Sequence, residues 1–120
     1  SLMQQKKIQK IFIGADRITK NYDVANKIGS YNLAVIAHYH KIPFYVVAPT
    51  STFDQNLTSG QDIEIEQRSS KEVYGVNSRF GHIQWSASKK VYNPAFDITP
   101  YCLITAIITE KGIHKNNEKT

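Results

Sequence analysis

Three polar residues near the start of this 120-residue chain have side chains that suit proton transfer and the binding of a phosphorylated ligand. Asp16 directly follows an apolar run, and a carboxylate that strand ends partly desolvate has a raised pKa, which suits a general acid or base. The amide of Asn26 can hold a hydroxyl group, and the ammonium of Lys27 can meet a phosphate. The same residues are also compatible with a structural interpretation, in which Asp16 caps a turn or pairs with Arg17 and the Asn26–Lys27 pair lies on a solvated helix face.

Other polar residues indicate structure more than chemistry. His38 and His40 are two positions apart, so they do not share a helix face and are not a zinc pair, and one cysteine with four scattered histidines offers no zinc spacing. We expect Cys102 to be a small buried residue. Asp97 could cap a following helix or line a site, and the first interpretation is the safer one. The chain contains neither G-x-G-x-x-G nor G-x-x-x-x-G-K-[ST], so no phosphate-binding glycine loop is predicted.

The elements that must position these residues follow from the apolar pattern. Residues 9–14 predict a buried strand that ends at glycine, and residues 44–48 predict a second one that Pro49 stops. Between them, apolar residues recur at spacings of three and four after Asp23, which predicts a helix of roughly sixteen residues with Asp23 as its N-cap and Asn26–Lys27 in its first turn. Strand, helix and strand form a βαβ unit. Ligands in such sheets collect beyond the carboxyl ends of the strands, where Asp16 lies.

The second half of the chain is less regular. Alternation over residues 63–66 predicts a half-exposed strand, and residues 73–91 predict a surface excursion rich in Gly, Ser and Asn. Thr99 and Pro100 resemble the cap and first turn of a short buried helix over residues 103–108, with Gly112 as its stop. The chain is therefore interpreted as one α/β domain. The strands are few for a doubly wound sheet, which indicates that part of the domain lies outside this sequence.

Charge and hydropathy narrow the classes of function. The chain carries 15 Lys and Arg against 10 Asp and Glu, a net charge of +5. Most of this excess lies near the two ends, and no basic stripe with interleaved aromatic residues runs through the middle, so nucleic-acid binding is disfavoured. No apolar run approaches the length of a membrane span, and no secretory leader is recognisable. We therefore expect no membrane association and a cytoplasmic protein, with the nucleus left open as a second location.

Several strings resemble a known family in their order and spacing. The chain is similar to the methylthioribose-1-phosphate isomerases over nearly all of residues 8–113. These enzymes are related to the alpha, beta and delta regulatory subunits of the guanine nucleotide exchange factor of translation initiation, and to ribose-1,5-bisphosphate isomerase. The strings that carry the resemblance are Gly14-Ala15-Asp16-Arg17-Ile18, Asp23-Val24-Ala25-Asn26-Lys27-Ile28-Gly29, Pro43 to Pro49, Asn93 to Pro100, and Ile107-Ile108-Thr109-Glu110.

The resemblance implies a fold and an activity. The fold is a Rossmann-like parallel sheet flanked by helices, of which residues 1–120 are only the C-terminal portion, without the N-terminal helical domain and the first strands. The activity is the aldose to ketose isomerisation of 5-methylthioribose 1-phosphate to 5-methylthioribulose 1-phosphate in methionine salvage, without a cofactor or metal, in a homodimer. The family's catalytic cysteine and its phosphate-binding Arg-Gly-Ala string belong to the N-terminal part. This fragment alone is therefore expected to be inactive without the N-terminal half of the same protein.

The resemblance also assigns roles to individual residues. Asp16 matches the catalytic acid, and Asn26 and Lys27 match the substrate-binding pair, whereas Cys102 does not match the catalytic cysteine. Tyr22 stands where the family usually has glycine, and Glu66-Gln67-Arg68 replaces a usual Glu-Glu-Arg. Two alternatives remain open. A regulatory subunit of the exchange factor would bind partner subunits without catalysis, and a ribose-1,5-bisphosphate isomerase would need a second phosphate pocket.

Overall fold

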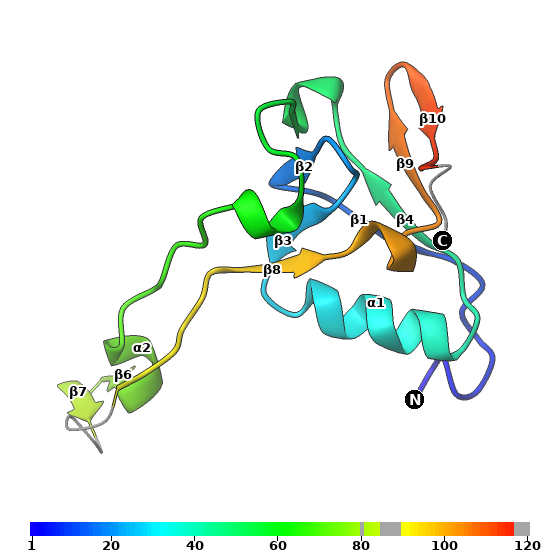
Figure 1. Cartoon of the computed structure of the whole chain (residues 1–120). Helices are drawn as coiled ribbons and strands as arrows, with labels where there is room; N and C mark the ends of the chain where they lie inside the picture. The colour runs from blue at the N-terminus through cyan, green and yellow to red at the C-terminus, as the bar shows by residue number, and fades with distance from the viewer. Residues whose placement is uncertain (80, 85–89, 117–120) are drawn as a thin grey trace. The chain divides into compact units, whose positions relative to one another are not determined.

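The computed structural model describes residues 1–79, 81–84 and 90–116, which divide into two compact units (Figure 1). The larger unit comprises residues 1–64 together with the chain from Phe96 onward, and the smaller unit comprises Ile65–Ala95. All three candidate site residues, Asp16, Asn26 and Lys27, belong to the larger unit.

A mainly parallel sheet forms one part of the larger unit. Its strand order is β1-β4-β9-β10, in which β1, β4 and β9 pair in parallel and β10 pairs with β9 in antiparallel fashion. The α/β class and the parallel pairing of the two strands predicted around residues 9–14 and 44–48 are confirmed. The bounds of the strands are β1 (Ile11–Ile13), β4 (Phe44–Val47), β9 (Ala106–Thr109) and β10 (Gly112–His114).

The helix predicted over residues 103–108 is wrong. Residues 101–103 form one turn of 3₁₀ helix after Pro100, and the chain then enters β9, which pairs with β4. A short apolar run of this kind does not distinguish a buried helix from a buried strand. Ile104, Thr105 and Ile107 are β-branched, which favours a strand, and a free edge of β4 is available for parallel pairing.

The larger unit contains a second sheet, whose strands alternate along the sequence with those of the first. Its order is β5-β2-β3-β8, with β2 antiparallel to β3, β3 antiparallel to β8, and β5 parallel to β2. Short 3₁₀ turns over Thr50–Thr52 and Gly60–Asp62 flank the edge strand β5. The bounds are β2 (Arg17–Thr19), β3 (Val24–Lys27), β5 (Phe53–Asp54) and β8 (Phe96–Thr99).

The long helix predicted from Asp23 is therefore two elements. Residues 24–27 form β3, and α1 spans Ser30–Tyr39. Pairing with strands on both sides holds residues 24–27 extended, and Gly29, with φ of 102°, adopts the left-handed conformation that turns the chain into the helix. Asp23 is not the N-cap, and Asn26 and Lys27 lie on a strand, so the predicted first-turn position of this pair is also wrong.

The hydrophobic core joins both sheets to α1. Phe44, Val46 and Ile107 of the parallel sheet are fully buried, as are Ile18 and Val24 of the second sheet. Helix α1 contacts β4, β8 and the turn at residues 101–103, and it contributes two buried alanines to the core (Figure 1). The opposite face of the parallel sheet is more exposed, with Phe12 55% and Val47 46% accessible to solvent.

The smaller unit contains α2 (Lys71–Tyr74) and a hairpin of β6 (Gly75–Ser78) and β7 (Gly81–Gln84). The predicted excursion over residues 73–91 lies within this unit, and its residues 80 and 85–89 fall outside the described ones. The half-exposed strand predicted over residues 63–66 is absent. The backbone there is irregular, and the carbonyl of Glu66 accepts a hydrogen bond from the N–H of Ala95 at 2.8 Å.

Within the described part of the chain, every helix is too short or too polar to cross a membrane.

Candidate active site

The β2–β3 hairpin brings Asp16 close to the strand that carries Asn26. Ala25 is the register partner of Arg17, and the Ala25 carbonyl also accepts the N–H of Asp16 at 2.8 Å. Asp16 and Arg17 thus both lie opposite Ala25, which is the two-against-one arrangement of a β-bulge and not a continuation of the regular ladder. The predicted acid therefore lies beside the residue that precedes the predicted amide. Asp16 is exposed, so the described residues do not provide the desolvation predicted for it.

Lys27 ends β3 directly after Asn26 and is exposed. Side chains alternate along a strand, so Lys27 starts from the face opposite to Asn26. Its carbonyl accepts the Ser30 hydroxyl at 2.7 Å, and that hydroxyl oxygen in turn accepts the Asn26 side-chain N–H at 3.2 Å. Ser30, which the sequence interpretation missed, therefore fixes both the Asn26 amide and the path of the chain after Lys27. A serine just after a glycine, where a helix begins, is the signal that indicates this role.

Asp97 of β8 faces Asn26 on the other side, in register with it. One oxygen of its carboxylate, Oδ2, accepts the N–H of Gly29 at 2.7 Å and the N–H of Tyr31 at 3.1 Å. Asp97 thus satisfies the N-terminus of α1 from another strand, whereas the sequence suggested a cap on a following helix. Asn26 and Asp97 thus face each other across β3 and β8.

The carboxylate of Asp23 fixes the β2–β3 turn to other parts of the chain. Asp23 is 9% exposed, and its two oxygens accept the N–H groups of Gly60, at 2.8 Å, and Tyr101, at 2.9 Å. Gly60 is required there, because a Cβ atom would overlap the Ile98 side chain and lie 3.3 Å from Asp23 Cβ. Asp23 therefore ties the hairpin to two distant segments of the larger unit.

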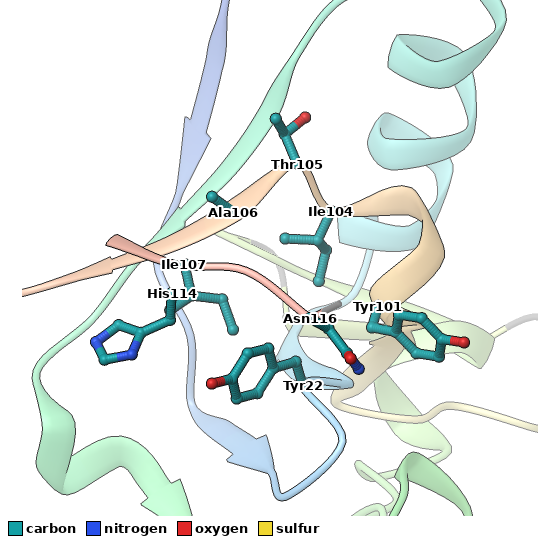
Figure 2. A pocket seen from close by; sticks show the side chains of 8 residues that line it. All are labelled: Tyr22, Tyr101, Ile104, Thr105, Ala106, Ile107, His114 and Asn116. Carbon is teal, nitrogen blue, oxygen red and sulfur yellow. The ribbon is translucent and has the colours of Figure 1, made fainter. Parts of the chain in front are cut away.

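Tyr22 precedes Asp23 with φ of 72°, the left-handed conformation that favours glycine. The resemblance predicts glycine at this position, and the left-handed backbone of Tyr22 is a conformation that glycine adopts readily. The Tyr22 ring packs edge-on against Phe53, with ring centroids 5.8 Å apart, and lines a cavity of about 10 Å³. Figure 2 shows the lining of this cavity, to which His114 and Asn116 of the C-terminal segment also contribute. Asn116 donates its amide N–H to the Asn21 carbonyl at 2.9 Å.

The carboxyl ends of β4 and β9 are joined by Thr50 and Glu110. The Glu110 carboxylate accepts the Thr50 N–H at 2.9 Å and also accepts the Thr50 hydroxyl. These hydrogen bonds stabilise the charged form, and they lower the pKa of Glu110 below its ordinary value. This pair lies at the edge of the parallel sheet where ligands of such folds bind.

The larger cavities lie elsewhere. A groove of about 700 Å³ runs between the N-terminal residues and the face of α1 that contains Leu33, Ile36 and Tyr39. A second groove of about 330 Å³ is lined by Cys102, His38 and Lys41. Cys102 is exposed, so the prediction of a buried thiol is wrong. Neither groove includes Asp16, Asn26 or Lys27.

Across the described residues, no three His, Cys, Asp or Glu side chains come together in a group that could hold a metal ion. Asp16 and Asn26 instead offer a carboxylate that suits proton transfer and an amide that suits hydrogen bonding, on two neighbouring segments of the β2–β3 hairpin.

Residues 1–116 match the profile of the Initiation factor 2 subunit family. The chain belongs to this family. The chain spans about a third of the length of the curated relatives that it matches.

Two isomerases are similar to this family member. The methylthioribose-1-phosphate isomerase of Yersinia pestis (strain Pestoides F) is 54% identical over 114 residues, which are 94% of this chain and 33% of the relative. The crystal structure of 5-methylthioribose 1-phosphate isomerase from Pyrococcus horikoshii OT3 superposes with a TM-score of 0.81 at 49% identity, over 93% of this chain and 30% of that one. The predicted resemblance to these isomerases is confirmed.

A translation factor is similar to a comparable degree. The crystal structure of the translation initiation factor eIF-2B, subunit delta, from A. fulgidus superposes with a TM-score of 0.80 at 45% identity, over 93% of this chain and 32% of that one. The fold is therefore shared by the enzyme and by the translation factor.

Proposed function

We propose that the protein to which this chain belongs is a methylthioribose-1-phosphate isomerase, which converts 5-methylthioribose 1-phosphate to 5-methylthioribulose 1-phosphate in methionine salvage. The observation that carries the proposal is the 54% identity to enzymes of that name over almost the whole chain. The hydrogen bond from the Asp16 N–H to the carbonyl of Ala25, the residue before Asn26, supports it, because it keeps a carboxyl group near an amide that can orient a sugar hydroxyl.

The chemistry that this assigns to Asp16 follows from the substrate. Phosphate on the anomeric oxygen prevents the sugar ring from opening as a free hemiacetal does. A proton delivered to the ring oxygen lets its bond to C1 break and leaves C1 electron-poor. A hydrogen then moves with its electron pair from C2 to C1, and the C2 hydroxyl releases a proton as the ketone forms. Asp16 donates the first proton in this proposal, and Asn26 and Lys27 hold the hydroxyl groups and the phosphate.

The remaining part of the site comes from the N-terminal region that the relatives possess. Asp16 is exposed and lies outside both large grooves, so another segment must cover it to exclude water from the reaction. We place the complete protein in the cytoplasm as a homodimer, with a sugar phosphate as its substrate and the N-terminal half of the same protein completing the site.

The test is an isomerase assay on the complete natural polypeptide that contains these residues. Asp16→Asn keeps the size of the side chain and removes the acid, and we expect turnover to fall by about 10² to 10⁴. Asp62→Asn, which changes another exposed aspartate, is the matched control and should leave turnover unchanged. Absence of isomerase activity in the unmodified protein would refute the proposed function, and full activity in Asp16→Asn would refute the role of Asp16.

A regulatory subunit of a translation exchange factor is the second candidate, favoured by the 45% identity to the delta subunit structure. This function depends on partner subunits and not on proton transfer. It predicts that the protein copurifies with other subunits of the factor and that Asp16→Asn leaves this association intact while no isomerase activity is found in either form.

A further inference from the structure

Helix α1 begins without a cap of its own. Its N-cap residue is Gly29, which has no side chain to accept a hydrogen bond, and its first turn contains no acidic residue. The first N–H groups of a helix have no partner within the helix, and leaving them unsatisfied is costly. The carboxylate of Asp97, from a strand 68 residues further along the chain, takes the N–H groups of Gly29 and Tyr31 in place of a local cap.

The same aspartate is also the strand partner of Asn26. In the β3–β8 ladder Asp97 faces Asn26, so one residue is fixed to the site strand through its backbone and to the helix through its side chain. The segment from Asn26 to Ser30 is thereby held on two sides, by Asp97 and by the Ser30 hydroxyl, which bonds the Asn26 amide and the Lys27 carbonyl. Without the carboxylate, Ser30 would be left as the side chain that bonds this turn, beside the backbone pairing of β3 with β8.

We propose that Asp97 is a positioning residue of the site, which sets the direction of the Asn26–Lys27 pair by anchoring the start of α1. This inference rests on the proposed function and deepens it. It also indicates how the substrate's phosphate is held. Because Asp97 already accepts the N–H groups of Gly29 and Tyr31 at the start of α1, the phosphate does not take these two donors, and within this chain its counter-charge is the Lys27 ammonium.

The experiment compares two substitutions of Asp97 in the complete protein. Only Oδ2 accepts the two N–H groups, so the single carbonyl oxygen of Asp97→Asn can replace it and keep both bonds. Asp97→Ala removes both. We expect the KM of the sugar phosphate to rise about tenfold or more in Asp97→Ala with a smaller fall in kcat, and to stay within about threefold of the unmodified value in Asp97→Asn.

Asp62→Ala is the matched control for a general loss of structure. One oxygen of Asp62 also accepts two backbone N–H groups, those of Thr58 and Ser59, at 3.2 and 3.1 Å. The proposal requires that Asp62→Ala change the melting temperature without raising KM. An unchanged KM in Asp97→Ala, or an equal rise in Asp62→Ala, would overturn the proposal. If Asp97→Ala does not fold, Asp97→Ser serves instead, because the serine side chain is too short for its hydroxyl to reach both N–H groups.

The two hypotheses fail in different ways. A complete protein without isomerase activity would overturn the proposed function, but the capping of α1 by Asp97 could still be tested. The rate of amide hydrogen exchange at Gly29 and Tyr31 measures this capping directly, and it should increase in Asp97→Ala and not in Asp97→Asn. Equal exchange in both variants would overturn the anchoring role of Asp97.

Discussion

The two sheets of the larger unit are stabilised in different ways. The parallel sheet places Phe44, Val46 and Ile107 in the core, where burial of apolar surface supplies the stability. The β5-β2-β3-β8 sheet also has buried apolar residues, but its turn and its exit to α1 are fixed by two carboxylates, Asp23 and Asp97, on backbone N–H groups. The candidate site lies on the second sheet, so individual polar contacts determine its geometry.

This difference matters because the two kinds of interaction respond differently to substitution. Apolar packing is shared among many neighbours and its loss scales with the volume removed. The loss caused by substituting a carboxylate that accepts two N–H groups depends on whether one oxygen or both oxygens accept them. The same Asp→Asn substitution therefore has different effects at different positions. The predictions that follow test the contrast, from the largest expected effect to the smallest.

The largest loss of stability is expected from Phe44→Ala in the parallel sheet. The side chain is 1% exposed, and its removal leaves a cavity, so the free energy of unfolding should fall by about 3–5 kcal/mol in urea denaturation. Phe12→Ala in the neighbouring strand is the control, because Phe12 is 55% exposed. An equal loss in the two variants would show that burial does not govern this sheet.

Asp23→Asn should have the next largest effect, a loss of about 1–3 kcal/mol in the same measurement. Each oxygen of Asp23 accepts a different N–H, and the amide nitrogen of Asn would face one of these donors. Asp97→Asn keeps its single accepting oxygen and should cost clearly less. Similar losses for the two substitutions would contradict the distinction between the two carboxylates.

A smaller effect is expected at Tyr22, where glycine should be more stabilising than alanine. Its φ of 72° is strained for any residue with a Cβ, so Tyr22→Gly should be more stable than Tyr22→Ala by about 1 kcal/mol. At Tyr45, in the extended strand β4, the order should reverse because glycine is disfavoured there. Thermal unfolding of the four variants measures both differences, and the same order at both positions would rule out backbone strain as the cause.

The smallest effect is expected from Glu110→Gln at the edge of the parallel sheet. The lowered pKa of Glu110 means that its hydrogen bonds to Thr50 stabilise the fold above pH 4.5, the ordinary value, and that this contribution is lost as the pH falls through the lower folded value. Glu110→Gln should lower the melting temperature by at most about 2 °C at pH 7 and by less at pH 3.5, because the carboxyl is exposed. A difference that grows toward acid pH would contradict this.

The apolar pattern predicted the parallel sheet well. The strands around Ile11–Ile13 and Phe44–Val47 are continuous runs bounded by glycine and proline, and such runs have one stable location, inside a sheet. The run before Thr109 was misassigned because periodicity does not separate a short buried helix from a short buried strand, and pairing with β4 decided between them.

The second sheet was harder to predict because its contacts are long-range. Helical spacing after Asp23 is a genuine feature, but Val24 to Lys27 are extended by strands from both sides, one of them β8, far along the chain. The side-chain chemistry of Asp16, Asn26 and Lys27 made them candidates, the resemblance assigned their catalytic and binding roles, and these roles stay predictions. No local pattern indicates that Asp97 caps a helix 66 residues earlier, since that bond exists only in the folded protein.

The anchoring of α1 by Asp97 also constrains the order in which the protein folds. The chain leaves the ribosome from its N-terminus, so β3 and α1 emerge long before β8 supplies their cap. Closing so long a loop is slow compared with forming a local hairpin. During synthesis, the Asn26–Lys27 segment therefore reaches its final conformation only after the residues around Asp97 have been translated.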